Sequence, residues 1–270
     1  MNAFATHFAF EFKSTLRNPT QLLMNYLFPL AFYAMMGLVM IQINPGFKDI
    51  IIPSLVIFAI MVGTVLGLSA PLVESRDAGI YRSFKINGVP ALSILAIPTL
   101  STVFHTLIAS AVIAVTGGPF FGGATPANWG AFAIITLATA FCLGALGALI
   151  GVVATGSRST VLLAQGIFLP SMLLGGLMMP LSVLPESVRF VSGLLPTTYA
   201  MQAMDGLAYA RDTVFDPALS LGILVLSGLV STLLALYLFN WDSRNSSRRG
   251  HPLMGLIAIL PFIAGIILAG

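Results

Sequence analysis

Residues 50–73 read IIIPSLVIFAIMVGTVLGLSAPLV and contain no Asp, Glu, Lys or Arg. The hydrocarbon core of a bilayer is about 30 Å thick, and a helix needs roughly 20 apolar residues to cross it. Five more runs of this kind lie near residues 21–43, 93–116, 130–154, 160–180 and 217–239. The runs are continuous rather than alternating, which favours helices over barrel strands. The sequence therefore predicts an all-α integral membrane protein with a bundle of six spanning helices.

The basic residues lie between these runs and indicate an orientation. With a cytoplasmic N-terminus, the inner segments hold nine of the 12 Lys and Arg residues: Lys13, Arg17, Arg76, Arg82, Lys85, Arg158, Arg244, Arg248 and Arg249. The outer segments hold only Lys48, Arg189 and Arg211. Because cytoplasmic loops carry an excess of Lys and Arg, we expect a multi-pass protein with its N-terminus in the cytoplasm. The same scatter leaves no basic patch for a nucleic acid.

A seventh apolar run, residues 252–270, follows the basic tail and is just long enough to span. Pro252 and Pro261 interrupt it. We expect an additional spanning helix, with a re-entrant or surface-lying segment held by Arg248 and Arg249 as the alternative. The chain is accordingly divided into a transmembrane domain, 1–245, and a basic linker with an extra hydrophobic segment, 246–270.

Residues 2–17 have the pattern of an amphipathic surface helix. At 100° per residue, one face collects Phe4, Phe8 and Phe12, whereas Lys13 and Arg17 lie on the other. Such a helix lies in the headgroup plane and can touch a cytoplasmic partner. The alternative is a plain basic leader to the first span.

The segment 74–90, between the second and third spans, is the most polar stretch of the chain. Glu74, Arg76 and Asp77 precede apolar and aromatic residues, a spacing that predicts a short helix with a charged side and a bulky side. Asn87-Gly88 would end that helix. A knob of this kind can insert into a groove of another protein, although any loop that joins two spans must also be polar.

The outer segment 181–216 is too apolar for a solvated loop and too broken for a span. Pro185, Gly193 and Pro196 divide it into two short pieces, and Thr197 or Thr198 could cap the second. Half-helices that enter the membrane from outside fit this pattern, which is tolerated only where protein or a water-filled cavity covers the backbone. An interfacial loop lying flat is the alternative.

Several kinds of chemistry are missing from the sequence. No G-x-x-x-x-G-K-[ST] loop is present, so ATP and Mg²⁺ would have to be bound by another subunit. We expect no enzyme site, cofactor or metal on this chain, because its one cysteine, Cys142, lies in an apolar run and its three histidines are scattered. Only His105 could titrate within a span, which argues against an ion-coupled carrier; we expect it to hydrogen-bond a neighbouring helix.

Short motifs resemble those of the ABC-2 permeases, which include drug, polysaccharide and lipid exporters. Glu74-x-x-x-x-Gly79, followed by Arg82, Gly88 and Pro90, is similar to the family's loop after the second span, which acts as the coupling helix to the ATPase. The family's fifth-span signature and the motif after it resemble Pro170-Ser171-Met172-Leu173-Leu174-Gly175-Gly176, Met179-Pro180 and Leu195-Pro196-x-x-Tyr199. The resemblance covers about residues 1–245.

The resemblance implies a homodimer or pseudo-dimer of permeases in a bacterial plasma membrane, driven by two cytoplasmic P-loop ATPase subunits. In this reading 2–17 is the interface helix, Arg158 marks a second cytoplasmic contact, and 181–216 forms outer re-entrant hairpins. We therefore expect export of a hydrophobic or amphiphilic drug, lipid or glycan-like cargo. The alternatives are a self-sufficient ion-coupled carrier or channel, and a membrane scaffold that transports nothing.

Overall fold

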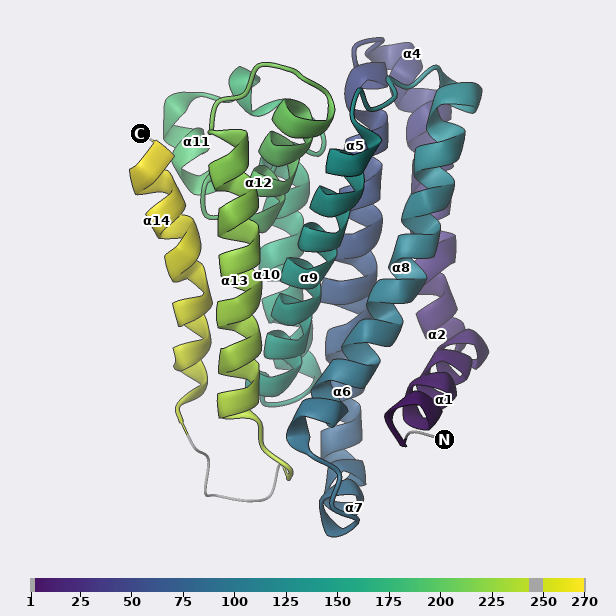
Figure 1. The fold of residues 1–270 in the computed structure, drawn as a ribbon, viewed down its shortest axis with the longest axis vertical. Helices are drawn as coiled ribbons and strands as arrows, with labels where there is room; N and C mark the ends of the chain where they lie inside the picture. Colours follow the sequence, from purple (N-terminus) through teal and green to yellow (C-terminus); the bar gives the residue numbers. More distant parts are fainter. Residues whose placement is uncertain (1–2, 243–249, 270) are drawn as a thin grey trace.

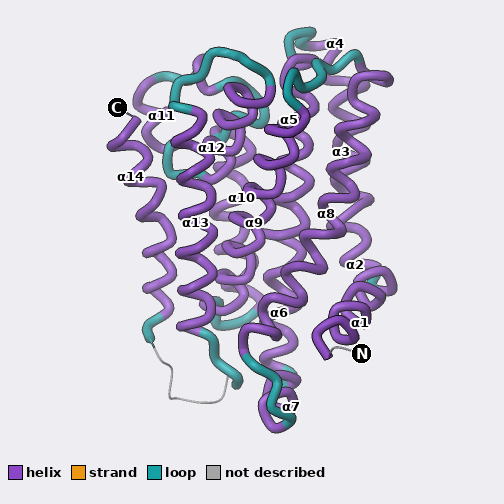
Figure 2. Tube along the Cα trace, in the orientation of Figure 1, coloured by secondary structure: helices purple, strands orange, loops and turns teal. Residues whose placement is uncertain are grey.

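The protein's computed structural model describes residues 3–242 and 250–269, and every regular element within these ranges is a helix (Figures 1 and 2). Five helices are long and apolar enough to cross a membrane: Pro19–Ile43, Phe47–Asp77, Ala91–Phe121, Trp129–Val153 and Pro217–Leu238. A further helix of 18 residues, α10 (Ser157–Leu174), runs beside them. All six predicted runs thus fall on helices of one bundle, and the all-α prediction is confirmed.

Two of the long helices contain wider π-helical turns. The first consists of α2 (Pro19–Leu22), η1 (Leu23–Leu27), α3 (Phe28–Met35), η2 (Met36–Met40) and α4 (Ile41–Ile43). The second consists of α5 (Phe47–Met61), η3 (Val62–Leu68) and α6 (Ser69–Asp77). The remaining long helices are α8 (Ala91–Phe121), α9 (Trp129–Val153) and α13 (Pro217–Leu238).

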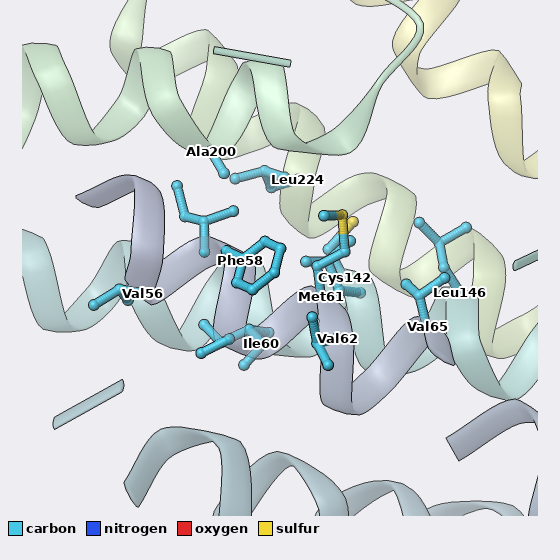
Figure 3. Close-up of a cluster of buried hydrophobic side chains, with 14 of the residues drawn as sticks. Val56, Phe58, Ile60, Met61, Val62, Val65, Cys142, Leu146, Ala200 and Leu224 are labelled. Atoms are coloured by element: carbon cyan, nitrogen blue, oxygen red, sulfur yellow. The ribbon is translucent and has the colours of Figure 1, made fainter. Parts of the chain in front are cut away.

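The second long helix forms the centre of the bundle. Its most apolar window is 94% buried, because α8, α9 and α12 (Pro196–Ala203) pack around it. Figure 3 shows Phe58 and Met61 of this helix near Cys142, Ala200 and Leu224 from its neighbours. A helix that is apolar on every side and enclosed by protein serves as the rigid axis of the bundle.

Glycines allow the central helix to approach its neighbours closely. A Cβ atom on Gly147 of α9 would lie 2.1 Å from the carbonyl oxygen of Thr64. A Cβ atom on Gly63 would lie 2.2 Å from the side chain of Thr106 on α8. The motifs Gly63-x-x-x-Gly67 and Gly147-x-x-x-Gly151 thus serve packing between helices of the same chain.

The two ends of the bundle carry different elements (Figure 1). One end holds α1 (Ala3–Arg17), α7 (Ile80–Ile86) and the start of α10; the other holds α4 and α11 (Glu186–Ser192). The segments predicted to be cytoplasmic therefore share one end, as the basic residues require. Arg244, Arg248 and Arg249, which were part of that prediction, lie outside the described residues.

The C-terminal segment runs along α13 toward the end that holds α11 (Figure 1). It begins with eight residues of 3₁₀-helix, η6 (Pro252–Ile259), and continues as α14 (Leu260–Ala269), ten residues long. At about 2.0 and 1.5 Å per residue these pieces extend roughly 31 Å, about the thickness of the hydrocarbon core. The segment is thus long enough for the expected span, because its 3₁₀-helical part rises farther per residue than an α-helix does.

Candidate functional site

The segment 74–90 forms a knob at the end of the bundle that holds α1 (Figure 1). α6 continues the second long helix to Asp77, and α7 follows after a sharp turn at Gly79, whose φ is 75°. Gly88, with a φ of 73°, ends α7, and Pro90 precedes α8. Because this backbone conformation costs other residues about 1–2 kcal/mol, the two glycines define both ends of α7. Glu74, at the base of the knob, is exposed.

Arg76 is turned into the protein and does not lie on the exposed surface of the knob. It is 5% exposed, and its guanidinium donates hydrogen bonds to the carbonyl oxygens of Val152 at 3.2 Å and Ala154 at 2.8 Å. These carbonyls end α9, where the helix dipole favours a cation. Its Nε also lies 3.3 Å from an oxygen of Asp77. Arg76 therefore joins α6 to α9, and of the predicted coupling residues it is the one whose charge a docked partner would not meet directly.

The knob is attached to the chain that follows α13. The Tyr81 and Phe239 ring centroids lie 5.6 Å apart, and Arg82 forms an ion pair with Asp242. Burial raises the pKa of the Tyr81 hydroxyl well above its usual range. A displacement of α7 would therefore move both the central helix, through α6, and the C-terminal end of α13.

The N-terminal helix α1 packs its aromatic face against α8. Phe12 stacks on His105 with ring centroids 4.2 Å apart, and the His7 ring centroid lies 5.6 Å from that of Phe84 in α7. Phe8 is half-buried beside Phe12, and Phe4 is 45% exposed. Lys13 and Arg17 are exposed on the opposite side. The predicted amphipathic helix is present, and its apolar face contacts protein.

His105 accepts or donates one hydrogen bond to the first long helix. Its Nδ1 lies 2.6 Å from the hydroxyl oxygen of Tyr26 in η1. This contact confirms the predicted hydrogen bond to a neighbouring helix. Arg158, the other predicted cytoplasmic contact, is exposed in the first turn of α10 at the same end of the bundle.

The predicted fifth span ends earlier than residue 180. α10 stops at Leu174, and Gly175 and Gly176 turn the chain. A Cβ atom on Gly175 would lie 1.9 Å from Oγ1 of Thr197, and Gly176 has a φ of 87°. The chain then passes through Pro180 and η4 (Leu181–Val183) to Pro185, which precedes α11. The prediction of a helix to residue 180 is wrong because this close contact requires a turn.

The second piece of the outer hairpin, α12, enters the bundle. All eight of its residues are buried, which fits the predicted re-entrant half-helix. Its N-cap, however, is Leu195, without a side-chain cap, and Pro196 occupies the first turn. Thr198 instead donates a hydrogen bond of 2.7 Å to the carbonyl oxygen of Ser192. The capping role predicted for Thr197 or Thr198 is therefore wrong.

Further contacts close the hairpin, and sequence reasoning missed them. Tyr199, 1% exposed, donates a hydrogen bond of 2.9 Å to the carbonyl oxygen of Phe262 in α14. Arg211 pairs with Asp205 at 3.0 Å and donates to the carbonyl oxygen of Asp49 at 2.7 Å. The opposite charges of Asp205 and Arg211, six residues apart, were the only local sequence signal for their ion pair.

The bundle of long apolar helices defines a multi-pass membrane protein. The family model of the ABC-2 type transporter matches residues 2–209, and the chain therefore belongs to the ABC-2 type transporter family. Members of this family are membrane-spanning permease subunits of ABC transporters, which associate with ATP-binding subunits. No curated protein and no solved structure matches the chain.

Proposed function

We propose that this chain is the permease subunit of an ATP-driven exporter and that a separate P-loop ATPase supplies the energy. The observation that carries the proposal is the double attachment of α7. α6 joins this short helix directly to the buried central helix, and the Arg82–Asp242 ion pair joins it to the inner end of α13. A partner that pushes on α7 would therefore act on two long helices at once.

The transport cycle follows from this mechanical connection. Closure of the ATPase subunits around ATP and Mg²⁺ pushes the segment 74–90, with Arg158 and the α1 helix as further contacts. The second and third long helices tilt and carry the motion to the outer hairpin, 181–216. The hydrogen bond from Arg211 to the carbonyl oxygen of Asp49 joins that hairpin to the outer end of the central helix. Opening of the hairpin releases the cargo outside the cell.

The cargo is hydrophobic or amphiphilic. The six predicted runs contain no Asp, Glu, Lys or Arg, so the spans offer apolar, Met, Ser and Thr side chains rather than charges for selection. A charged residue within a span is expensive in a bilayer, so contacts with cargo inside the spans are apolar or made by hydroxyl groups. The working unit pairs this chain with a second permease, identical or related, in the plasma membrane of a bacterium, with its N-terminus in the cytoplasm.

Affinity purification from the native membrane tests the partnership. The chain is extracted in mild detergent, and the proteins that co-purify are identified by mass spectrometry. A stoichiometric P-loop ATPase is expected. Repeated absence of an ATPase from a folded preparation would contradict the proposal and favour a self-sufficient carrier, a channel or a scaffold.

A substitution at the knob tests the coupling. Glu74→Ala should leave the protein in the membrane and its ATPase active but abolish ATP-dependent transport. Glu186→Ala, at the other end of the bundle, is the matched control and should transport normally. Normal transport by Glu74→Ala would show that this residue has no coupling role.

A further inference from the structure

A cavity lies between the N-terminal helix and the knob. Its volume is about 790 Å³, within the range of about 300–1,000 Å³ that is typical of ligand sites. α1 forms one wall, α6 and α7 form the second, and α8 forms the third. A single permease chain supplies all of these walls, at the end of the bundle that holds α1 and α7.

The charged side chains that line the cavity are both acidic. Glu11 comes from α1 and Glu74 from α6, and no Lys or Arg is among the described residues that line it. Neither carboxylate forms a salt bridge within the described part of the chain, and Glu11 is half-buried. The partly buried carboxylate of Glu11 has only nearby His7 to offset its desolvation, and a bound cation would lower that cost.

Two threonine side chains also line the cavity. Thr102 of α8 is 3% exposed and Thr15 of α1 is 6% exposed, and both line it. Neither side chain makes a hydrogen bond to a described residue. Their hydroxyl groups are therefore free to form hydrogen bonds with water or a ligand in the cavity.

Aromatic side chains complete the lining. Phe10 enters from α1, and Tyr81 and Phe84 enter from α7. Aromatic faces attract cations and also provide apolar contact for the body of a ligand. Acidic and aromatic groups together favour an organic cation, because the carboxylates attract its charge and the rings contact its apolar body.

We propose that this cavity binds an organic cation with an apolar body and that Glu11 and Glu74 hold its positive charge from opposite walls. Its role as the place where cargo enters the permease rests on the proposed export function, whereas binding itself does not. Since Glu74 belongs to the knob, an occupied cavity would join α1 to α6 before the ATPase subunits close.

Two probes of similar shape and opposite charge test the site. Tetraphenylphosphonium and tetraphenylborate are titrated into the purified full-length permease in an uncharged detergent and measured by calorimetry, with empty micelles subtracted. The cation should bind and the anion should not. Glu11→Gln and Glu74→Gln should each weaken binding of the cation about tenfold. The control, Glu186→Gln, removes an equivalent charge from α11 and should bind normally.

Equal binding of the two probes, or unchanged affinity in both cavity variants, would overturn the proposal. Nanodiscs then distinguish the source of the cation. Competition by phosphatidylethanolamine, with phosphatidylglycerol as the reference lipid, identifies a lipid headgroup; absence of competition identifies a free amphiphile. Because no ATPase is present, failure of binding leaves the proposed function standing, and failure to co-purify an ATPase leaves the binding site standing.

Discussion

The hydroxyl of Tyr199 donates a hydrogen bond to the carbonyl oxygen of Phe262, with 2.9 Å between the two oxygens. Tyr199 belongs to the re-entrant helix α12, whereas Phe262 lies in α14, beyond the part of the chain that matches the family. A Cβ atom on Gly265 would lie 2.5 Å from the same hydroxyl oxygen. The additional C-terminal segment is therefore packed against the outer hairpin and stabilises it.

Tyr199→Phe should lower the stability of this contact. The substitution keeps the ring and removes one buried hydrogen bond, which typically contributes about 1 kcal/mol. Thermal unfolding in detergent, followed by intrinsic fluorescence, should show a lower Tm. Tyr237→Phe, at a tyrosine that is 50% exposed, is the control. Equal Tm values for the two variants would mean that the hydrogen bond does not hold α14 in place.

Arg76→Ala should reduce the amount of folded protein in the membrane. The substitution leaves the carbonyl oxygens at the end of α9 without their donor in a buried place, and each such group costs about 1–3 kcal/mol. Arg158→Ala removes an exposed charge and should leave the amount of protein unchanged. Detergent-soluble yield and Tm are the measurements. If Arg76→Ala folded normally but no longer bound the ATPase, Arg76 would be a residue that contacts the ATPase rather than one that stabilises the fold.

The Arg82–Asp242 pair should matter more for transport than for stability. Arg82 is 55% exposed, so we expect a coupling free energy of about 0.2–1 kcal/mol in a double-mutant cycle. Arg82→Asp and Asp242→Arg should each weaken ATP-dependent transport, and the double charge swap should recover it in part. If the double variant transported no better than either single variant, the ion pair between α7 and the end of α13 would have no role in coupling.

Binding of tetraphenylphosphonium should weaken on acidification, and the decrease should begin at a higher pH than it would with an exposed glutamate at position 11. Burial raises the pKa of Glu11, and nearby His7 opposes this only in part. Its carboxylate therefore gains a proton, and loses its attraction for a cation, at a higher pH than an exposed glutamate. Glu74 and Tyr81 face the same cavity from the opposite wall.

Two variants assign this pH dependence. Glu11→Gln should remove the early decrease in affinity, since no carboxyl group is left there to titrate. His7→Asn should keep it, because His7 makes only the smaller, opposing contribution to the pKa of Glu11. If the profile of Glu11→Gln coincided with that of the native chain, another group would be responsible.

The spanning helices could be predicted because bilayer thickness fixes their length and composition. Glu74 and Gly79 could be placed in one short loop because their positions relative to the second span are local. The inward turn of Arg76 could not be predicted, since its hydrogen-bond acceptors lie 76 and 78 residues away on α9. The same applies to Tyr199, whose acceptor lies 63 residues away.

Close helix contacts explain the remaining differences. The end of α10 at Leu174 depends on Thr197, which occupies the space that a side chain at Gly175 would need. The sequence showed only that the segment containing η6 is apolar and interrupted by proline. Its 3₁₀ geometry could not be predicted from that pattern. Sequence patterns show which residues are apolar or able to turn, whereas these outcomes depend on packing between distant segments.

Cross-linking from α7 tests the central claim most directly. The one natural cysteine, Cys142, is buried, so a cysteine introduced at exposed Asn87 would be the main reactive site. A thiol-directed cross-linker in native membranes, followed by mass spectrometry, should capture a P-loop ATPase from Asn87→Cys and none from Ser187→Cys on α11. Capture of an ATPase from neither position, with both thiols shown to react, would contradict the account of this chain as an ATPase-driven permease.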